Sequence, residues 1–102
     1  MGSSWKALAD DSRRQMLVIL KRGEKTPSEI ARHFEFTLPA LSTHLRVLKD
    51  AGLVRERKDG QNRYYSVNRS AMREMVQFFD LFWDDKLQSL KEYVENKEGK
   101  RK

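Results

Sequence analysis

The chain has 102 residues, 38% hydrophobic and 35% charged, and no cysteine, which fits one folded domain and excludes disulfides and thiolate metal sites. Charges interrupt every apolar run, and the N-terminus lacks the apolar core of a secretory signal, so we expect a soluble, cytoplasmic protein with no membrane contact. The net charge of +6 resides in residues 1–70, which hold 14 basic and 8 acidic side chains. Such an excess is compatible with a nucleic-acid surface, an acidic lipid surface or simply solubility.

Three short helices are predicted in the first third of the chain. Trp5, Leu8 and Ala9 are expected on one face of the first. Asp11 or Ser12 can cap the second, and the next glycine ends it. The sequence Thr-Pro-Ser-Glu at residues 26–29 has the form of a capping box with proline at the first helical position. It predicts a third helix that ends near Glu35.

A fourth helix is predicted to begin after Thr37, whose hydroxyl can cap it. Its three leucines follow at i, i+4 and i+7 and form a single apolar stripe, consisting of Leu41, Leu45 and Leu48. The opposite face carries Pro39, Ser42, Thr43 and Arg46. Short hydroxyl side chains and an arginine allow a helix to lie close in the DNA major groove and reach base edges or phosphates.

The apolar period changes after this helix. Residues 53–58 alternate in part, residues 59–62 (Asp-Gly-Gln-Asn) are typical of a turn, and residues 64–67 are typical of a strand. We therefore predict a two-stranded hairpin with a basic tip. A long final helix is expected from about Asn68, followed by a charged, flexible tail at residues 97–102.

Together these elements predict a helix-turn-helix followed by a wing. The run ALADDSRRQMLVILKRGEKTPSEIARHFEFTLPALSTHLRVLKDAGLVRERKDGQNRYYSVN resembles the ArsR/SmtB family of bacterial winged-helix repressors, above all in its PALSTHLRVLKDAGLV block. The resemblance implies a mainly α fold with a two-stranded β-hairpin wing, in the order α-α-α-α-β-β-α. It also implies a homodimer that binds double-stranded operator DNA and represses, often at its own promoter. Residues 1–96 would then form one DNA-binding domain with dimerising terminal helices.

Two groups of residues are predicted to contact DNA. The recognition-helix group is Thr37, Leu38, Pro39, Ser42, Thr43, His44 and Arg46. The wing group, which would reach flanking phosphates or the minor groove, is Arg57, Lys58, Gln61, Asn62 and Arg63. Related sequences often carry a polar residue in place of Leu38, so Leu38 either contacts a thymine methyl group or marks a helix that reads few bases directly.

The final helix has more aromatic residues than one face can bury in a monomer, which predicts an apolar patch that a partner covers. In the family resemblance the first and last helices form the dimer interface. The predicted interface residues are Trp5, Leu8, Phe78, Phe79, Phe82, Trp83, Leu87 and Leu90. A two-fold dimer would place its recognition helices about one DNA turn (~34 Å) apart and favour an inverted-repeat operator.

No metal site, cofactor or catalytic residue is predicted. The final helix has carboxylates but no histidine, so it lacks the Asp and His ligands of the zinc site that relatives carry, and carboxylates alone do not select a transition metal. The chain also has no cysteine nucleophile and no glycine-rich phosphate loop, which argues against an enzyme. Two other functions stay open: a winged-helix module that binds protein, and a regulator whose small-molecule effector, still unknown, binds between the final helix and the core.

Overall fold

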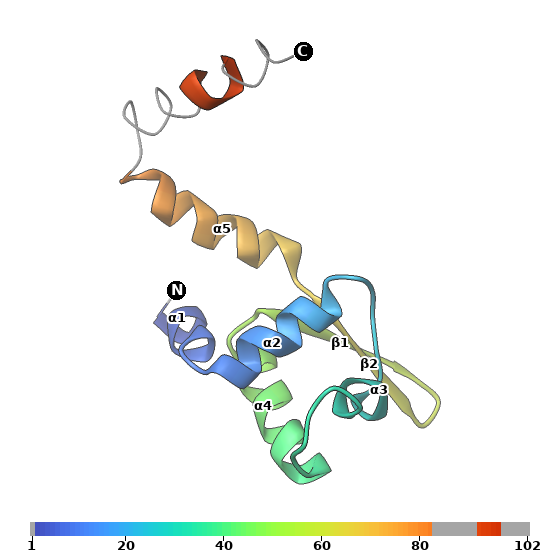
Figure 1. Ribbon diagram of the computed structural model, residues 1–102. Coiled ribbons are helices and arrows are strands. Elements are labelled where there is room, and N and C mark those ends of the chain that lie inside the picture. Colours follow the sequence, from blue (N-terminus) through green and yellow to red (C-terminus); the bar gives the residue numbers. More distant parts are fainter. Residues whose placement is uncertain (1, 83–91, 97–102) are drawn as a thin grey trace. The chain divides into compact units, whose positions relative to one another are not determined.

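The computed structural model describes residues 2–82 and 92–96 (Figure 1). Four helices are followed by a hairpin and a fifth helix, which confirms the predicted order. The elements are α1 (Gly2–Leu8), α2 (Asp11–Leu20), α3 (Pro27–Ala31), α4 (Leu38–Asp50), β1 (Val54–Asp59), β2 (Asn62–Val67) and α5 (Arg69–Asp80). In this part of the chain no helix is long and apolar enough to cross a membrane.

The chain forms two compact units, Met1–Met72 and Arg73–Lys102. The first unit contains α1 to β2 and the start of α5. The division of the chain that we expect at residue 96 stays a prediction.

Helix α4 lies at the centre of the first unit, where it contacts α1, α2, α3 and β1. Its leucine stripe is fully buried, as the i, i+4, i+7 spacing predicts, since side chains at these positions share one helix face. Around the stripe pack buried side chains from every neighbouring element, namely Ala7, Met16, Leu17, Leu20, Ile30, Leu53, Val54 and Tyr65. This packing fixes the orientation of the opposite, exposed face of α4.

The cap of α2 corrects the sequence prediction. Asp10, and not Asp11 or Ser12, is the N-cap residue: its backbone is extended and its carboxylate accepts a hydrogen bond from the backbone N–H of Arg13 at 3.1 Å. This hydrogen bond, the largest influence, lowers the pKa of Asp10. All three residues are good caps, so the backbone angle at Asp10 decides which of them serves.

The capping box of α3 is confirmed, with the helix shorter than expected. The Thr26 hydroxyl accepts from the backbone N–H of Glu29, and the Glu29 carboxylate accepts from that of Thr26. The helix ends at Ala31 rather than near Glu35, because the N–H groups of His33 and Phe34 bond to carbonyls three residues back. Such bonds tighten the last turn into a connector.

The wing is an antiparallel hairpin whose register pairs Val54 with Val67 and Asp59 with Asn62. Gly60 has a φ of 63°, the left-handed conformation that the two-residue turn requires. Lys25 adds an isolated antiparallel bridge to Tyr65, with N···O distances of 3.0 and 2.9 Å. The wing is therefore tied to the loop between α2 and α3.

The final helix is shorter than the sequence predicts. Helix α5 ends at Asp80, because the N–H groups of Leu81 and Phe82 bond to carbonyls three residues back, in a turn. The local sequence is rich in aromatic residues, which lose rotamer freedom in a helix. Residues 92–96 are helical. The predicted tail at 97–102 lies outside the described residues.

Candidate nucleic-acid interface

The exposed face of α4 carries the predicted recognition residues. Thr37 caps the helix by accepting from the backbone N–H of Ala40 at 3.3 Å, and Pro39 occupies the first turn, where its missing N–H costs nothing. The side chains of this face that are exposed to solvent are Leu38, Pro39, Ser42, Thr43 and Arg46. Leu38 is an exposed large apolar residue, with 52% of its surface accessible.

Two of the predicted recognition residues have partners within the protein. The Thr43 hydroxyl donates to the Pro39 carbonyl at 3.1 Å, which leaves its oxygen as an acceptor for a ligand. His44 is half-buried, with its ring 5.6 Å from that of Phe36 and its Nδ1 3.4 Å from a guanidinium nitrogen of Arg13. His44 therefore faces α2 and the loop before α4, and does not belong to the open face.

Arg13 links three helices at this point. Its Nε donates to the carbonyl of Ala7 at 2.7 Å and its Nη2 to that of Lys6 at 3.3 Å. Both carbonyls belong to the last turn of α1, and that of Lys6 also accepts from the backbone N–H of Ala9 at 3.2 Å. Arg13 thus caps α1 from α2 while its guanidinium lies beside His44 of α4.

A groove of about 390 Å³ separates the open face of α4 from the wing. Helix α4 contributes Ser42, Thr43, Arg46, Lys49 and Asp50, and the hairpin contributes Glu56, Arg63 and Tyr65. Three predicted recognition residues and one predicted wing residue therefore line the same groove, on elements that are rigidly packed. The lining carries three cations and two carboxylates, so it is polar throughout its length.

On the wing side of this groove, Glu56 contacts three neighbouring side chains. Its Oε2 accepts from the Tyr65 hydroxyl at 2.7 Å, and its Oε1 lies 3.3 Å from Lys49 Nζ. Arg63 lies 3.8 Å away on the same carboxylate. The hydrogen bond from Tyr65 is the largest influence that lowers the pKa of Glu56, and burial followed by this bond raises the pKa of Tyr65.

The cations on the two faces of the hairpin differ in their salt bridges. Cross-strand pairing places Lys58 and Arg63 on the Glu56 face and Arg57 on the opposite face. There Arg57 forms a bidentate ion pair with Glu24, with distances of 2.6 and 3.2 Å, and its guanidinium lies 4.5 Å from the Tyr64 ring. The Glu24 hydrogen bonds raise the pKa of Arg57 and lower that of Glu24. Arg57 is therefore occupied, whereas no salt bridge of the described residues includes Lys58.

The wing tip faces the start of α3 across a second cleft of about 460 Å³. Its lining consists of Thr26, Pro27, Ser28, Gln61, Asn62 and Arg63. Arg63 lines both this cleft and the groove beside α4. It is thus the side chain that connects the recognition helix with the tip of the wing.

Comparison with known proteins assigns the family. The sequence model of the bacterial regulatory proteins of the arsR family matches residues 10–56, from the cap of α2 to the middle of β1. The transcriptional repressor SdpR of Bacillus subtilis is 37% identical over 76 residues, which are 74% of this chain and 84% of SdpR. This chain belongs to the ArsR family. It is a DNA-binding transcriptional regulator with a winged helix-turn-helix, and it is not an enzyme.

Solved structures of ArsR-type regulators agree with the fold. A crystal structure of a possible transcriptional regulator for arsenical resistance matches with a TM-score of 0.70 and 41% identity, over 83% of this chain and 88% of the other. The homodimeric winged helix-turn-helix domain of Mb0332 from Mycobacterium bovis, solved by NMR, matches with a TM-score of 0.66 and 30% identity, over 84% and 80%.

Four groove residues of this ArsR-family chain were not predicted from the sequence, namely Lys49, Asp50, Glu56 and Tyr65. Lys49 lies three residues after Arg46 and seven after Ser42, so helical spacing could have placed it on the open face. Glu56 and Tyr65 are a cross-strand pair. Their place in the groove could not be found from the sequence, because it depends on how the hairpin packs against α4.

Five of the eight residues predicted at the dimer interface lie in the part of the chain that the structure describes. Trp5 and Leu8 of α1 are half-buried, and Phe78, Phe79 and Phe82 are exposed, the last with 67% of its surface accessible. The Phe78 ring meets those of Phe79 and Phe82 edge to face, at 5.8 and 5.3 Å. Trp83, Leu87 and Leu90 lie outside the described residues.

Metal ligands do not gather in the part of the chain that the structure describes: no group of three His, Cys, Asp or Glu side chains is placed to hold an ion there. Three acidic residues of the final segment, Asp84, Asp85 and Glu98, lie outside that part. The lack of a metal site in this ArsR-family chain therefore stays a prediction.

Proposed function

We propose that this protein is a homodimeric, cytoplasmic repressor that binds inverted-repeat operators, including one at its own promoter, and that it does not respond to metals. The observation that carries the proposal is the groove between α4 and the wing, where Ser42, Thr43 and Arg46 stand opposite Arg63. Hydroxyl and guanidinium groups on a rigid helix face are suited to reading base edges, and a cation on the facing hairpin is suited to the phosphates beside them.

The open face of α4 supplies sequence reading in this proposal. Small side chains at Ser42 and Thr43 let the helix approach the base pairs closely, and Arg46 reaches guanine or an adjacent phosphate. Leu38, exposed at the start of the helix, meets a thymine methyl group. His44 supports the helix from behind through Arg13 and Phe36.

The wing supplies affinity rather than sequence reading. Lys58 and Arg63 share the face of the hairpin that borders the groove, while Gln61 and Asn62 are exposed at its tip. Contacts of these residues with phosphates fix the protein on the duplex without reading bases. Arg57 contributes less, because Glu24 already holds it.

Dimerisation rests on the exposed aromatic residues at the end of α5 and in the turn that follows it. Phe78, Phe79 and Phe82 form an apolar cluster of the kind that marks a protein interface. The homodimeric state that is described for the similar Mycobacterium bovis domain supports this assignment. A two-fold axis relates the two recognition helices and therefore requires a two-fold related operator.

Repression is supported by the name of SdpR, the similar repressor of Bacillus subtilis. Independence from metals is supported by the histidine-free final helix and by the lack of a ligand cluster among residues 2–82 and 92–96. When the protein represses its own promoter, its concentration controls the rate at which it is synthesised.

The test is fluorescence anisotropy with the DNA upstream of the protein's own gene and with a scrambled duplex, over a salt series. We expect tight, salt-sensitive binding to the upstream DNA only. Arg46→Ala reduces the difference between the two duplexes by about 5- to 160-fold, if Arg46 contributes about 1–3 kcal/mol of discrimination. Arg55→Ala, which changes an exposed arginine that is hydrogen-bonded to Asn68, is the matched control. Equal binding to both duplexes by the unmodified protein would contradict the proposal.

The dimer is tested separately by analytical ultracentrifugation. Phe82→Asp places a charge in the exposed aromatic cluster and is expected to produce monomers that no longer bind a site with two half-sites. Gln77→Asp, at an exposed position of α5 five residues earlier, is the control for added charge. A Phe82→Asp protein that remains dimeric would place the interface elsewhere.

A further inference from the structure

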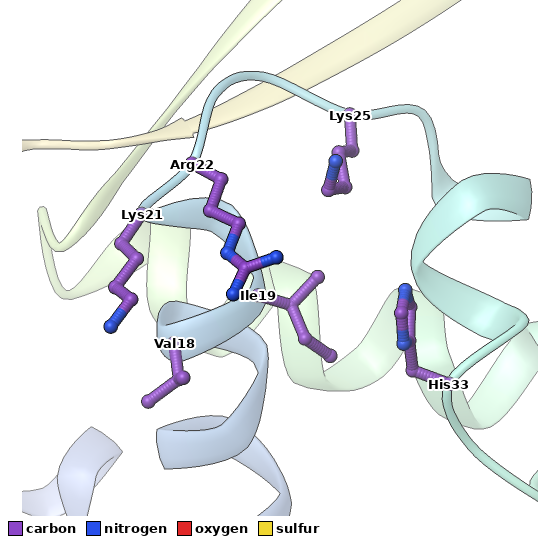
Figure 2. Close-up of a pocket in the computed structure, with 6 residues that line it drawn as sticks. All are labelled: Val18, Ile19, Lys21, Arg22, Lys25 and His33. Carbon is purple, nitrogen blue, oxygen red and sulfur yellow. The ribbon is translucent and has the colours of Figure 1, made fainter.

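A second polar pocket lies away from the groove that we assign to DNA. It has a volume of about 360 Å³ and is formed by the end of α2, the loop that follows it and His33, two residues after α3. Figure 2 shows its six lining residues, Val18, Ile19, Lys21, Arg22, Lys25 and His33. None of them lines the groove between α4 and the wing.

The lining of this pocket combines cationic and apolar side chains. Lys21, Arg22 and Lys25 bring three positive charges and His33 brings an imidazole, while no carboxylate lines the pocket. Val18 and Ile19 are its apolar residues, and Val18 exposes 58% of its surface to solvent. An exposed valine beside three cations is suited to a ligand that has both an anionic group and an apolar body.

The cations of the pocket lack the neutralising partners that other cations of the chain have. The salt bridges of the described residues engage Arg14, Lys49, Arg57 and Arg63, and none of these side chains lines the pocket. Glu29, whose pKa is lowered mainly by its hydrogen bonds with Thr26 and in part by Lys25, does not line it either. An anion that enters would therefore meet three cations that form no salt bridge among the described residues.

The backbone that carries these cations is held in place. The N–H and carbonyl of Lys25 both bond to Tyr65 of β2, and the carbonyl of Lys21 accepts from the Arg69 guanidinium at 3.2 Å. Gly23, between them, adopts a φ of 145° and donates to the carbonyl of Leu20. A fixed backbone lowers the entropic cost of gathering the side chains around a ligand.

We propose that this pocket binds a small organic anion whose carboxylate, sulfonate or phosphate group lies between Arg22 and Lys25 and whose apolar body lies against Val18 and Ile19. The volume is within the range of pockets that bind small molecules. His33 adds a hydrogen bond to the anionic group. This inference goes beyond the proposed function, because the pocket is not part of the groove that we assign to DNA. Its binding of an anion can therefore be measured without DNA.

The test uses 2-naphthoate as the probe, followed by ¹H–¹⁵N NMR of the full chain. We expect saturable shifts of the backbone amides that surround the pocket, at residues 18–25 and at His33. Inorganic phosphate, which has no apolar body, and 2-naphthalenemethanol, which has no charge, each bind at least tenfold more weakly. Shifts scattered over the chain, or equal binding of the neutral alcohol, would overturn the proposal.

Paired substitutions separate this pocket from its surroundings. Arg22→Gln with Lys25→Gln is expected to weaken naphthoate binding at least tenfold, while the spectrum keeps its dispersion and so reports a folded protein. Arg32→Gln removes a nearby exposed arginine that does not line the pocket and is expected to leave binding unchanged. Unchanged binding in the double variant would overturn the proposal.

DNA phosphate is the rival anion, and a final measurement distinguishes it. In the absence of naphthoate, the double variant is expected to bind DNA within twofold of Arg32→Gln, with the same salt dependence. A large loss of DNA affinity together with a flatter salt dependence would show that the pocket cations contact the DNA backbone, and would overturn the assignment to a small anion. If the chain binds no DNA sequence specifically, the naphthoate titration still tests whether the pocket binds a small anion.

Discussion

Glu56→Gln tests the arrangement of the groove between α4 and the wing. The substitution keeps the shape of the side chain and removes its charge. Only 10% of the Glu56 side chain is exposed, and its carboxylate accepts a 2.7 Å hydrogen bond from the Tyr65 hydroxyl. A hydrogen bond to a charged group contributes about 1.5–3 kcal/mol, of which a neutral amide retains a part. The exposed Lys49 and Arg63 add at most about 1 kcal/mol. We therefore expect a loss of about 1–2 kcal/mol in the free energy of unfolding at pH 7.

The assay is urea unfolding followed by circular dichroism, at one protein concentration because dimerisation would otherwise shift the midpoint. Tyr65→Phe and the double variant complete a cycle, in which we expect a coupling energy of about 1 kcal/mol. The pKa of Glu56 is lowered in the folded protein. The stabilisation is therefore present above the unfolded value of about 4.3 and is lost as the pH falls through the lower folded value. Equal stability of Glu56→Gln and the unmodified protein at pH 7, or a coupling energy near zero, would refute this reasoning.

Three further predictions concern the wing, the cap of α3 and the core. Arg57→Ala lowers DNA affinity and the salt slope less than Lys58→Ala in anisotropy measurements, because Glu24 holds Arg57; a larger effect of Arg57→Ala would mean that this ion pair opens on DNA. Thr26→Ala removes the capping box and costs about 1 kcal/mol in urea unfolding, and Thr26→Ser retains most of it; equal losses would contradict a role for the hydroxyl. Leu45→Ala, at a side chain that is 1% exposed, costs about 2–5 kcal/mol, whereas the exposed Leu38→Ala changes stability by less than about 0.5 kcal/mol; similar losses would contradict the assigned core.

Local patterns predict the elements that position the site. The capping box at Thr26 and Glu29 predicts where α3 begins, and the spacing of the leucines predicts which face of α4 is buried, because both depend on contacts within one or two helical turns. The choice of Asp10 as the cap of α2 could not be predicted in the same way. Three neighbouring residues had suitable side chains, and only the backbone angle separates them.

Contacts between distant segments account for the rest. Arg57 meets Glu24 across 33 residues, and Arg13 meets His44 across 31. Each of these side chains is an ordinary surface candidate in the sequence, and only the fold shows that a partner already holds it. The bridge between Lys25 and Tyr65, which ties the wing to the loop after α2, likewise has no local sequence signal.

The measurement that most directly tests sequence-specific binding by a dimer is a hydroxyl-radical footprint on the duplex that the protein selects best from a random pool. Selection from a random pool finds the preferred site whichever promoter the protein acts on. We expect two protected clusters, related by two-fold symmetry and about one helical turn (~34 Å) apart, as two copies of α4 in successive major grooves would produce. A single protected cluster, or protection no greater than on an unselected duplex, would contradict this expectation.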